Sequence, residues 1–144
     1  MSAMSAANNI VFKIINSTWQ DQWTNSLIGS FYKATEPLIS HAIKFKSTPR
    51  HKETCMTRIR LGNCWTNARL HKIKCHENGL CQTCQVPETV EHYLLHCIKQ
   101  AALQEMLKTA CKSASIAYTL NTVLTNSSCI DMIYSWIIKS NRRL

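Results

Sequence analysis

Apolar residues recur at intervals of three and four along most of this chain, which is the spacing of amphipathic helices. The pattern predicts a first helix over residues 17–30, in which three residues form one apolar stripe that faces the core: Trp19, Trp23 and Leu27. Ser17 and Gln20 have the spacing of a capping box, which places the start of this helix at Ser17.

Three further helices are predicted before residue 75. The first follows Thr35, with Pro37 in its first turn and four inward residues, Leu38, Ile39, Ala42 and Ile43. The next spans 50–61, stops at Gly62 and buries Cys55, Met56 and Ile59. A short one covers 65–74, with Leu70 and Ile73 facing inward.

The C-terminal half favours three more helices. A long one is expected from Pro87 and Thr89 through about Cys111, with an apolar face made of Val90, Leu94, Cys97, Ile98 and Ala101. Two others fit residues 114–124 and 128–139. The last carries an apolar stripe of Ile130, Ile133, Tyr134 and Ile137, whose partner is either this core or another chain.

Composition agrees with a mostly α fold, because three glycines and three prolines leave little material for the turns of a β-sandwich. A chain of 144 residues can bury one core of ordinary size. We therefore expect a flexible terminus over residues 1–16 and a single helical unit over 17–144. Within that unit we distinguish a basic segment (44–76), a cysteine knuckle (80–98) and C-terminal helices (99–140).

The sequence has neither a secretory signal pattern near residue 1 nor an apolar run suited to a membrane, so we expect an intracellular protein without membrane association. In a reducing compartment, its eight cysteines are thiols or metal ligands rather than disulfides. A nucleic-acid partner would favour the nucleus.

The net charge of +9 is concentrated in one stretch. Residues 44–74 contain nine basic residues against the single acid Glu53, whereas the rest of the chain has eight basic and seven acidic residues. Such a distribution is typical of a nucleic-acid footprint, although most charge runs are only solvated faces. Besides Lys44 and Lys46, the predicted contacts are Arg50, Lys52, Arg58, Arg60, Trp65, Arg69, Lys72 and Lys74.

Trp65 admits two interpretations. With Arg69, Lys72 and His76 it falls on one side of a helix, where an aromatic ring could stack on a base while the cations hold phosphates. The alternative is a core tryptophan beside ordinary surface charges, and the sequence slightly favours this alternative.

The segment from Cys81 to Cys97 carries the clearest chemical pattern, C-x2-C-x7-H-x4-C. Two thiolates three residues apart can grip a metal from one tight turn, and a histidine and cysteine five apart can reach it from the start of a helix. The predicted ligands of one structural Zn²⁺ are Cys81, Cys84, His92 and Cys97. His96 is a minor alternative, and Cys75 and His76 lie close by. The remaining cysteines are expected to be buried thiols: Cys55, Cys64, Cys111 and Cys129.

Several runs resemble the C-terminal zinc-binding tail of reverse transcriptases from non-LTR (LINE-type) retrotransposons. They are Thr57-Arg-Ile-Arg-Leu-Gly62, Asn67-Ala-Arg-Leu-His71, Leu80-Cys-Gln-Thr-Cys84 and Glu88-Thr-Val-Glu-His92-Tyr-Leu-Leu-His-Cys97. The likeness is weaker at the Trp19 and Trp23 pair and at the last apolar helix. Asn63 stands where the family often has a histidine. The resemblance implies that the chain helps to hold template RNA or target DNA, without chemistry of its own.

Catalytic patterns are missing from the sequence. Two-metal nucleotidyl transfer needs converging carboxylates, yet the only aspartates are Asp21 and Asp131. There is also neither a glycine-rich phosphate loop nor a nucleophile elbow. We therefore expect a non-enzymatic, zinc-binding module that contacts RNA or DNA. Two alternatives remain, a protein-interaction module that docks a partner through residues 128–139 and an excised piece of a polyprotein.

Overall fold

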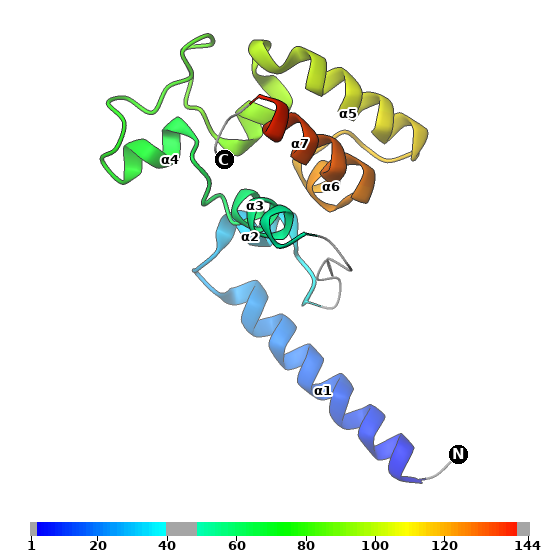
Figure 1. Ribbon diagram of the computed structural model, residues 1–144. Coiled ribbons are helices and arrows are strands. Elements are labelled where there is room, and N and C mark those ends of the chain that lie inside the picture. The colour runs from blue at the N-terminus through cyan, green and yellow to red at the C-terminus, as the bar shows by residue number, and fades with distance from the viewer. Residues whose placement is uncertain (1–2, 40–48, 141–144) are drawn as a thin grey trace. The chain divides into compact units, whose positions relative to one another are not determined.

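The computed structural model describes residues 3–39 and 49–140, and side chains from residue 7 onward. The elements in chain order are the helices α1 (Ala3–Asn25), α2 (Ser30–Thr35), α3 (Arg50–Arg60) and α4 (Asn67–Lys72), the π-helical turn η2 (His92–His96), the 3-10 turn η3 (Ile98–Gln100), and the helices α5 (Ala101–Ser113), α6 (Leu120–Thr125) and α7 (Ser127–Lys139) (Figure 1). Over the described ranges the only β-type pairing is an isolated bridge between Leu80 and Pro87. The prediction of a mostly α fold is confirmed.

The chain divides into two compact units, Met1–Lys44 and Phe45–Leu144. This division differs from the predicted flexible terminus over 1–16 and single unit over 17–144. Residues 3–16 are helical, and α1 leaves large apolar side chains exposed, among them Phe12 at 65%.

The first unit corrects three predictions made from the sequence. The first helix does not start at Ser17, whose hydroxyl donates to the carbonyl of Ile14 inside α1 instead of capping a terminus. Trp19 and Leu27 are exposed (55% and 98%), so the predicted core stripe is wrong for both. Trp23 alone packs, because its indole nitrogen donates to the Glu36 carbonyl (3.1 Å) and its ring meets Tyr32 edge to face.

The helix predicted after Thr35 does not begin there, since residues 36–38 are not helical. Its remaining inward positions, Ala42 and Ile43, lie outside the described residues. Instead, the short helix α2 precedes this point and follows Gly29, whose φ of 75° turns the chain between α1 and α2. Glycine adopts that left-handed conformation without the penalty of a Cβ atom.

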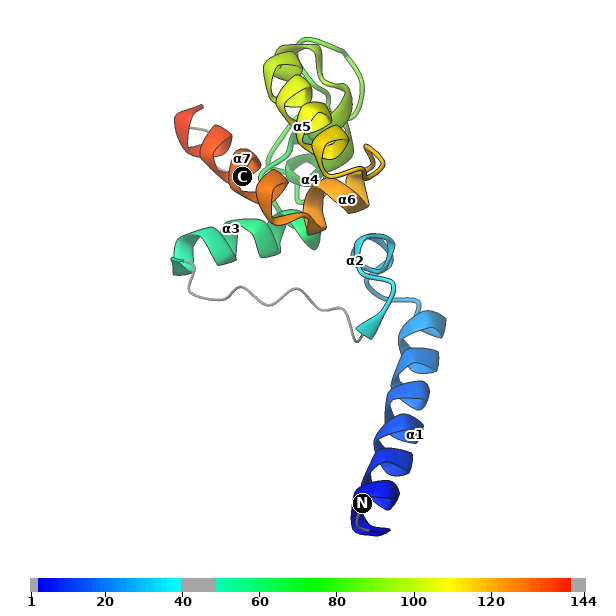
Figure 2. The same cartoon turned by 90° about the vertical axis from the view of Figure 1, so that its right-hand side faces the viewer.

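The core of the second unit is built by α5, α6 and α7, which lie side by side in both views, with α3 packed on α7 (Figure 2). On α3, α5 and α7 the buried side chains recur at helical spacing: Met56 and Ile59; Leu103, Leu107 and Cys111; Cys129, Ile130, Ile133 and Ile137. The short helix α6 buries the adjacent Val123 and Leu124. The prediction for α3 is confirmed for its bounds and for the burial of Met56 and Ile59, including its end before Gly62, which has a φ of 64°, but Cys55 is only half-buried.

The apolar stripe of α7 finds its partner in this core. Ile130, Ile133 and Ile137 are at most 4% exposed, and Tyr134 lies against His51 of α3. Lys52 of α3 also forms an ion pair with Asp131 of α7. Residues 128–139 are the predicted docking surface for a protein partner. Their apolar stripe instead packs in the core of the second unit.

Two predicted helices are shorter than expected. The helix α6 starts at Leu120 rather than 114 because Thr119 caps it, with Thr122 reciprocating in a capping box. The helix α4 spans only Asn67–Lys72, and Ile73, predicted to face inward, is 45% exposed. In the described part of the chain, no helix is both long and apolar enough to cross a membrane.

Candidate metal centre

A tight turn presents the first two cysteines. The backbone N–H of Cys81 donates to Val86 and that of Gln85 donates to Cys81 (2.8 and 2.9 Å), and the bridge between Leu80 and Pro87 closes the turn from outside. Gln85 has a φ of 55°, a left-handed conformation that lets the chain reverse within so few residues. The turn thereby places the thiols of Cys81 and Cys84 on one side.

His92 and Cys97 come from a distorted helix. In an α-helix, a residue five positions on is rotated by about 140° beyond a full turn, so the two side chains would point to different faces. The chain instead forms the π-helical turn η2, in which the N–H of Cys97 donates to the His92 carbonyl (2.7 Å). Cys97 then leaves the helix with a ψ of 120°. Single π-helical turns are frequent at functional sites, and this one brings both ligands to the same point.

This turn overturns the prediction of one continuous helix from residue 87 to 111. Ile98, predicted to lie on the apolar face, is 71% exposed because the break at Cys97 resets the helical phase. The helix α5 begins only at Ala101. The break therefore separates the turn that carries His92 and Cys97 from the helix face that packs in the core.

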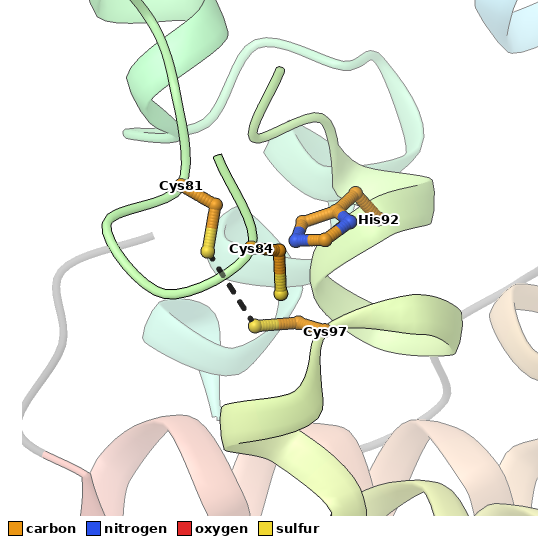
Figure 3. Close-up of side chains that lie close together, drawn as sticks. All are labelled: Cys81, Cys84, His92 and Cys97. Atoms are coloured by element: carbon orange, nitrogen blue, oxygen red, sulfur yellow. Dashed lines mark hydrogen bonds between the residues drawn. The ribbon is translucent and has the colours of Figure 1, made fainter. Parts of the chain in front are cut away.

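The four predicted ligands form one cluster, in which one donor atom from each lies within 4.8 Å of all the others. Figure 3 shows the side chains pointing toward one another from the cysteine turn and from η2. The sulfur atoms of Cys81 and Cys97 are 3.7 Å apart, far beyond the bonding distance of a disulfide. The cluster can hold a metal ion, and it is the only group of this kind in the described ranges.

His92 supplies a direct test of this fit. Its side chain is buried, and its Nε2 atom has no hydrogen-bond partner. A buried polar atom without a partner is costly, whereas a lone pair donated to a metal removes that cost. Three thiols and one imidazole therefore fit a metal better than they fit a metal-free core.

The thiols of the cluster have divergent pKa values. Burial alone would raise the pKa of Cys81, but hydrogen bonds from the backbone of Cys84 and Thr83 in the turn help to outweigh it, and the pKa falls to about 6. Burial and the neighbouring Cys81 sulfur raise the pKa of Cys97 to about 11. The first thiolate thus forms easily, while the second forms only when a cation compensates its charge.

The alternative ligands lie elsewhere. His96 and Cys75 are exposed and belong to no cluster of possible ligands among the described residues, and His76 accepts a hydrogen bond from the N–H of Gly79. Cys64, Cys111 and Cys129 are buried as predicted, and Cys55 is half-buried. Burial raises the pKa of Cys55, Cys64 and Cys129, which keeps these three thiols neutral.

Hydrogen bonds tie the metal centre to the helical core. The side chain of Gln104 on α5 donates to the Cys97 carbonyl (2.8 Å), and the indole of Trp136 on α7 donates to Gln100 in η3 (2.7 Å). Tyr93 and Leu94 of η2 are buried against this core. The second pair of ligands is therefore held from behind by α5 and α7.

The first pair of ligands is tied to α4. Asn67, the first residue of α4, donates its side-chain amide to the Leu80 carbonyl (2.8 Å) and its backbone N–H to the Glu88 carboxylate (3.1 Å). The N–H of Ala68 donates to the Glu88 carbonyl. Glu88 thereby caps the start of α4, and its negative charge suits the helix dipole. Sequence reasoning missed Asn67 and Glu88, because a cap supplied 21 residues away leaves no local signal.

The predicted nucleic-acid residues separate into two groups. Arg50, Arg58, Lys72 and Lys74 are exposed, Trp65 is 50% exposed and Arg69 is partly exposed. The interpretation of Trp65 as a core residue is wrong. Trp65 lies before the start of α4, and His76 lies after its end. The predicted stripe of Trp65, Arg69, Lys72 and His76 therefore does not form one face of a helix.

Two of the predicted contacts have structural roles instead. Arg60 is 4% exposed and its Nε donates to the Leu124 carbonyl at the end of α6, so the guanidinium is unavailable to a phosphate. Lys52 is neutralised by Asp131. Lys44 and Lys46 lie outside the described residues.

We compared the chain with protein-family models, curated proteins and solved structures, and found no match.

Proposed function

We propose that this chain is a non-catalytic, zinc-stabilised module that binds RNA or DNA through the exposed cations between Arg50 and Lys74. The observation that carries the proposal is the connection between the two features. Residues of the metal turn hold the start of α4, and the exposed part of the basic segment runs from α3 through α4. The resemblance of residues 58–97 to retrotransposon tails supports the same assignment and an origin in such an element.

Zinc is supported by the donor set and by spacing. Three thiolates and one imidazole form a closed four-ligand set of the kind that structural zinc sites use. Two Zn–S bonds of about 2.3 Å at the tetrahedral angle separate their sulfur atoms by about 3.8 Å. The 3.7 Å between the Cys81 and Cys97 sulfurs agrees with this value.

Nucleic acid is supported by the sign and exposure of the charges. Arg50, Arg58, Lys72 and Lys74 keep their charges at the surface, and the only acid of this stretch is Glu53. A one-signed surface attracts phosphates through counterion release. The absence of catalysis is part of the proposal, since the only aspartates belong to different units, Asp21 to the first and Asp131 to the second.

The salt dependence of binding tests this proposal. In the variant Arg50→Ala/Arg58→Ala/Lys72→Ala, each lost phosphate contact should flatten the slope of log K against log salt by about 0.7 to 0.9, or about 2.1 to 2.7 in total. The matched control removes three exposed lysines elsewhere, Lys13→Ala/Lys112→Ala/Lys139→Ala. Binding is measured by fluorescence anisotropy, with zinc content checked for each protein. Equal slopes in both triple variants would reduce the basic segment to a solvated face.

A docking role for α7 is less well supported. The apolar residues that would contact a partner are buried in the chain's own core, so such docking would have to open that core.

A further inference from the structure

The loop between α3 and α4, residues 61–66, places a large aromatic ring at the surface. Trp65 is 50% exposed and Leu61 is 49% exposed, while the two neighbours of Trp65, Cys64 and Thr66, are each 3% exposed. Thr66 is extended, with a φ of −77° and a ψ of 151°, and in extended backbone successive side chains point to opposite sides. Anchoring Cys64 and Thr66 inward therefore directs Trp65 outward.

The outward ring leaves its polar group without a protein partner. In the described part of the chain, Trp23 and Trp136 donate their indole N–H groups to Glu36 and Gln100, but no acceptor contacts the indole of Trp65. Tryptophan usually finds an acceptor when a protein uses it in packing. Half of the Trp65 side chain is therefore open to solvent, and its indole N–H makes no hydrogen bond within the fold of the described residues.

Asn63 links the two segments that carry Arg58 and Arg69 at the ends of this loop. Its backbone N–H donates to the Arg58 carbonyl (2.9 Å), and its side-chain oxygen accepts a hydrogen bond from Nε of Arg69 (2.9 Å). One residue therefore joins the last turn of α3 to α4 across the loop that holds Trp65. The bond leaves the terminal nitrogens of Arg69 available, and Arg58 is exposed.

We propose that the loop is a stacking site for single-stranded nucleic acid, in which an unpaired base stacks on Trp65 and the guanidinium groups of Arg58 and Arg69 contact the adjoining phosphates. The inference rests on the proposed function and specifies its substrate class. In a duplex, each base face is covered by its neighbours, so a side-chain ring can stack only on a base that is unpaired. An exposed ring on a loop whose flanking helices carry Arg58 and Arg69 matches that ligand, because every base offers a π-face and every nucleotide a phosphate.

The first unit provides a matched control. Trp19 of α1 is 55% exposed, as much as Trp65, but its nearest charged residues in the sequence are Asp21 and Lys13 rather than a pair of arginines. Removing Trp19 therefore measures the effect of losing an exposed indole without the proposed site.

The experiment compares Trp65→Ala, Trp65→Phe and Trp19→Ala in the full chain loaded with zinc. The probes are a twelve-nucleotide oligo(dT), the matching oligo(rU) and a twelve-base-pair DNA duplex at one salt concentration. Trp65→Ala should weaken single-strand binding roughly five- to a hundredfold and duplex binding less than twofold. Trp65→Phe should recover most of the loss, and Trp19→Ala should bind like the original chain. The two single strands distinguish RNA from DNA.

Two results would overturn the stacking site. The first is that Trp65→Ala keeps its affinity for single strands, and the second is that it loses equal affinity for single strands and duplex. Either result would mean that Trp65 does not stack on a base, while the proposal of phosphate binding by the basic segment would remain. If the original chain binds none of the probes, the proposed function itself fails, and the stacking inference fails with it.

Discussion

Two neighbouring stretches of the second unit are held together by different forces. In α5, α6 and α7, apolar side chains are buried at regular helical intervals, with Leu103, Leu107 and Ile133 fully enclosed. In residues 73–86, only Gly79 and Cys81 are buried. The C-terminal helices thus have a hydrophobic core, while the cysteine turn has hydrogen bonds and a cluster of side chains that can hold a metal ion.

The difference has a physical consequence. Burial of apolar surface stabilises the C-terminal helices whether or not a metal is bound. A turn without such burial depends on its ligands, because at metal sites of this kind binding free energy is folding free energy. The turn also holds the start of α4 through Asn67, so the metal should control the order of the basic surface more than that of the core.

The largest expected effect is therefore the loss of one ligand. Cys84→Ser should reduce zinc from about one ion per chain to near zero, which native mass spectrometry measures. Hydrogen exchange should then show faster exchange for the amides of residues 67–91, while those of α5 and α7 stay protected.

Leu107→Ala is the opposite control. It should lower the free energy of global unfolding by about 2 to 5 kcal/mol through a core cavity, yet retain zinc. Two results would contradict this difference between the cysteine turn and the C-terminal helices. One is that the amides of the turn stay protected from hydrogen exchange without metal, and the other is that Cys84→Ser loses all of its helices.

A smaller effect is expected at Gly79, where the turn approaches α4. Gly79 has a φ of 68°, and a Cβ atom there would lie 2.9 Å from Cβ of His71 and 3.3 Å from Cα of Ala68. Gly29 has a φ of 75°, but a Cβ atom at that position would meet no other atom within 4 Å among the described residues.

Both alanine variants incur the left-handed backbone penalty, of about 1 to 2 kcal/mol, but only Gly79→Ala adds a clash. Gly79→Ala should therefore be the more destabilising by roughly a further 1 to 3 kcal/mol, and it should also weaken zinc binding. Urea unfolding and chelator competition measure the two effects. Equal behaviour of the two variants would show that the turn does not need its close contact with α4.

The smallest effect concerns pH. In the metal-free chain Cys97 is protonated at neutral pH, because burial and the Cys81 sulfur raise its pKa to about 11. Metal binding must release this proton, so the metal-free form holds more protons and higher pH favours the bound form. Zinc affinity should rise at least about tenfold per pH unit from about 6 to 8, because each thiol ligand that is protonated in the metal-free chain releases one proton.

Below pH 6 the dependence should steepen, since the pKa of Cys81 is about 6 and a further proton must then be displaced. Competition with a chelator whose own pH dependence is known measures the affinity. A flat profile over the neutral range would show that Cys97 is not a thiolate ligand.

Local pattern was enough to predict α3, α7 and the four members of the metal cluster. Each depends on spacing along a short stretch of chain, as with Met56 and Ile59 on α3 or Cys81 and Cys84 in their turn. The same reasoning failed at Ser17, because a capping pattern is equally compatible with the interior of a longer helix. It also failed over residues 87–111, since nothing in the periodicity marks the π-helical turn before Cys97.

The sequence by itself determined the helical character, the position of the charge and the ligand types and spacing, because these properties belong to single residues and their near neighbours. Only the tertiary structure decided which charged and aromatic groups remain available. Arg60 and Lys52 are engaged by Leu124 and Asp131, 64 and 79 residues away, whereas Trp65 is directed outward by its buried neighbours. Exposure depends on what the rest of the chain packs against a residue, and no local pattern records it.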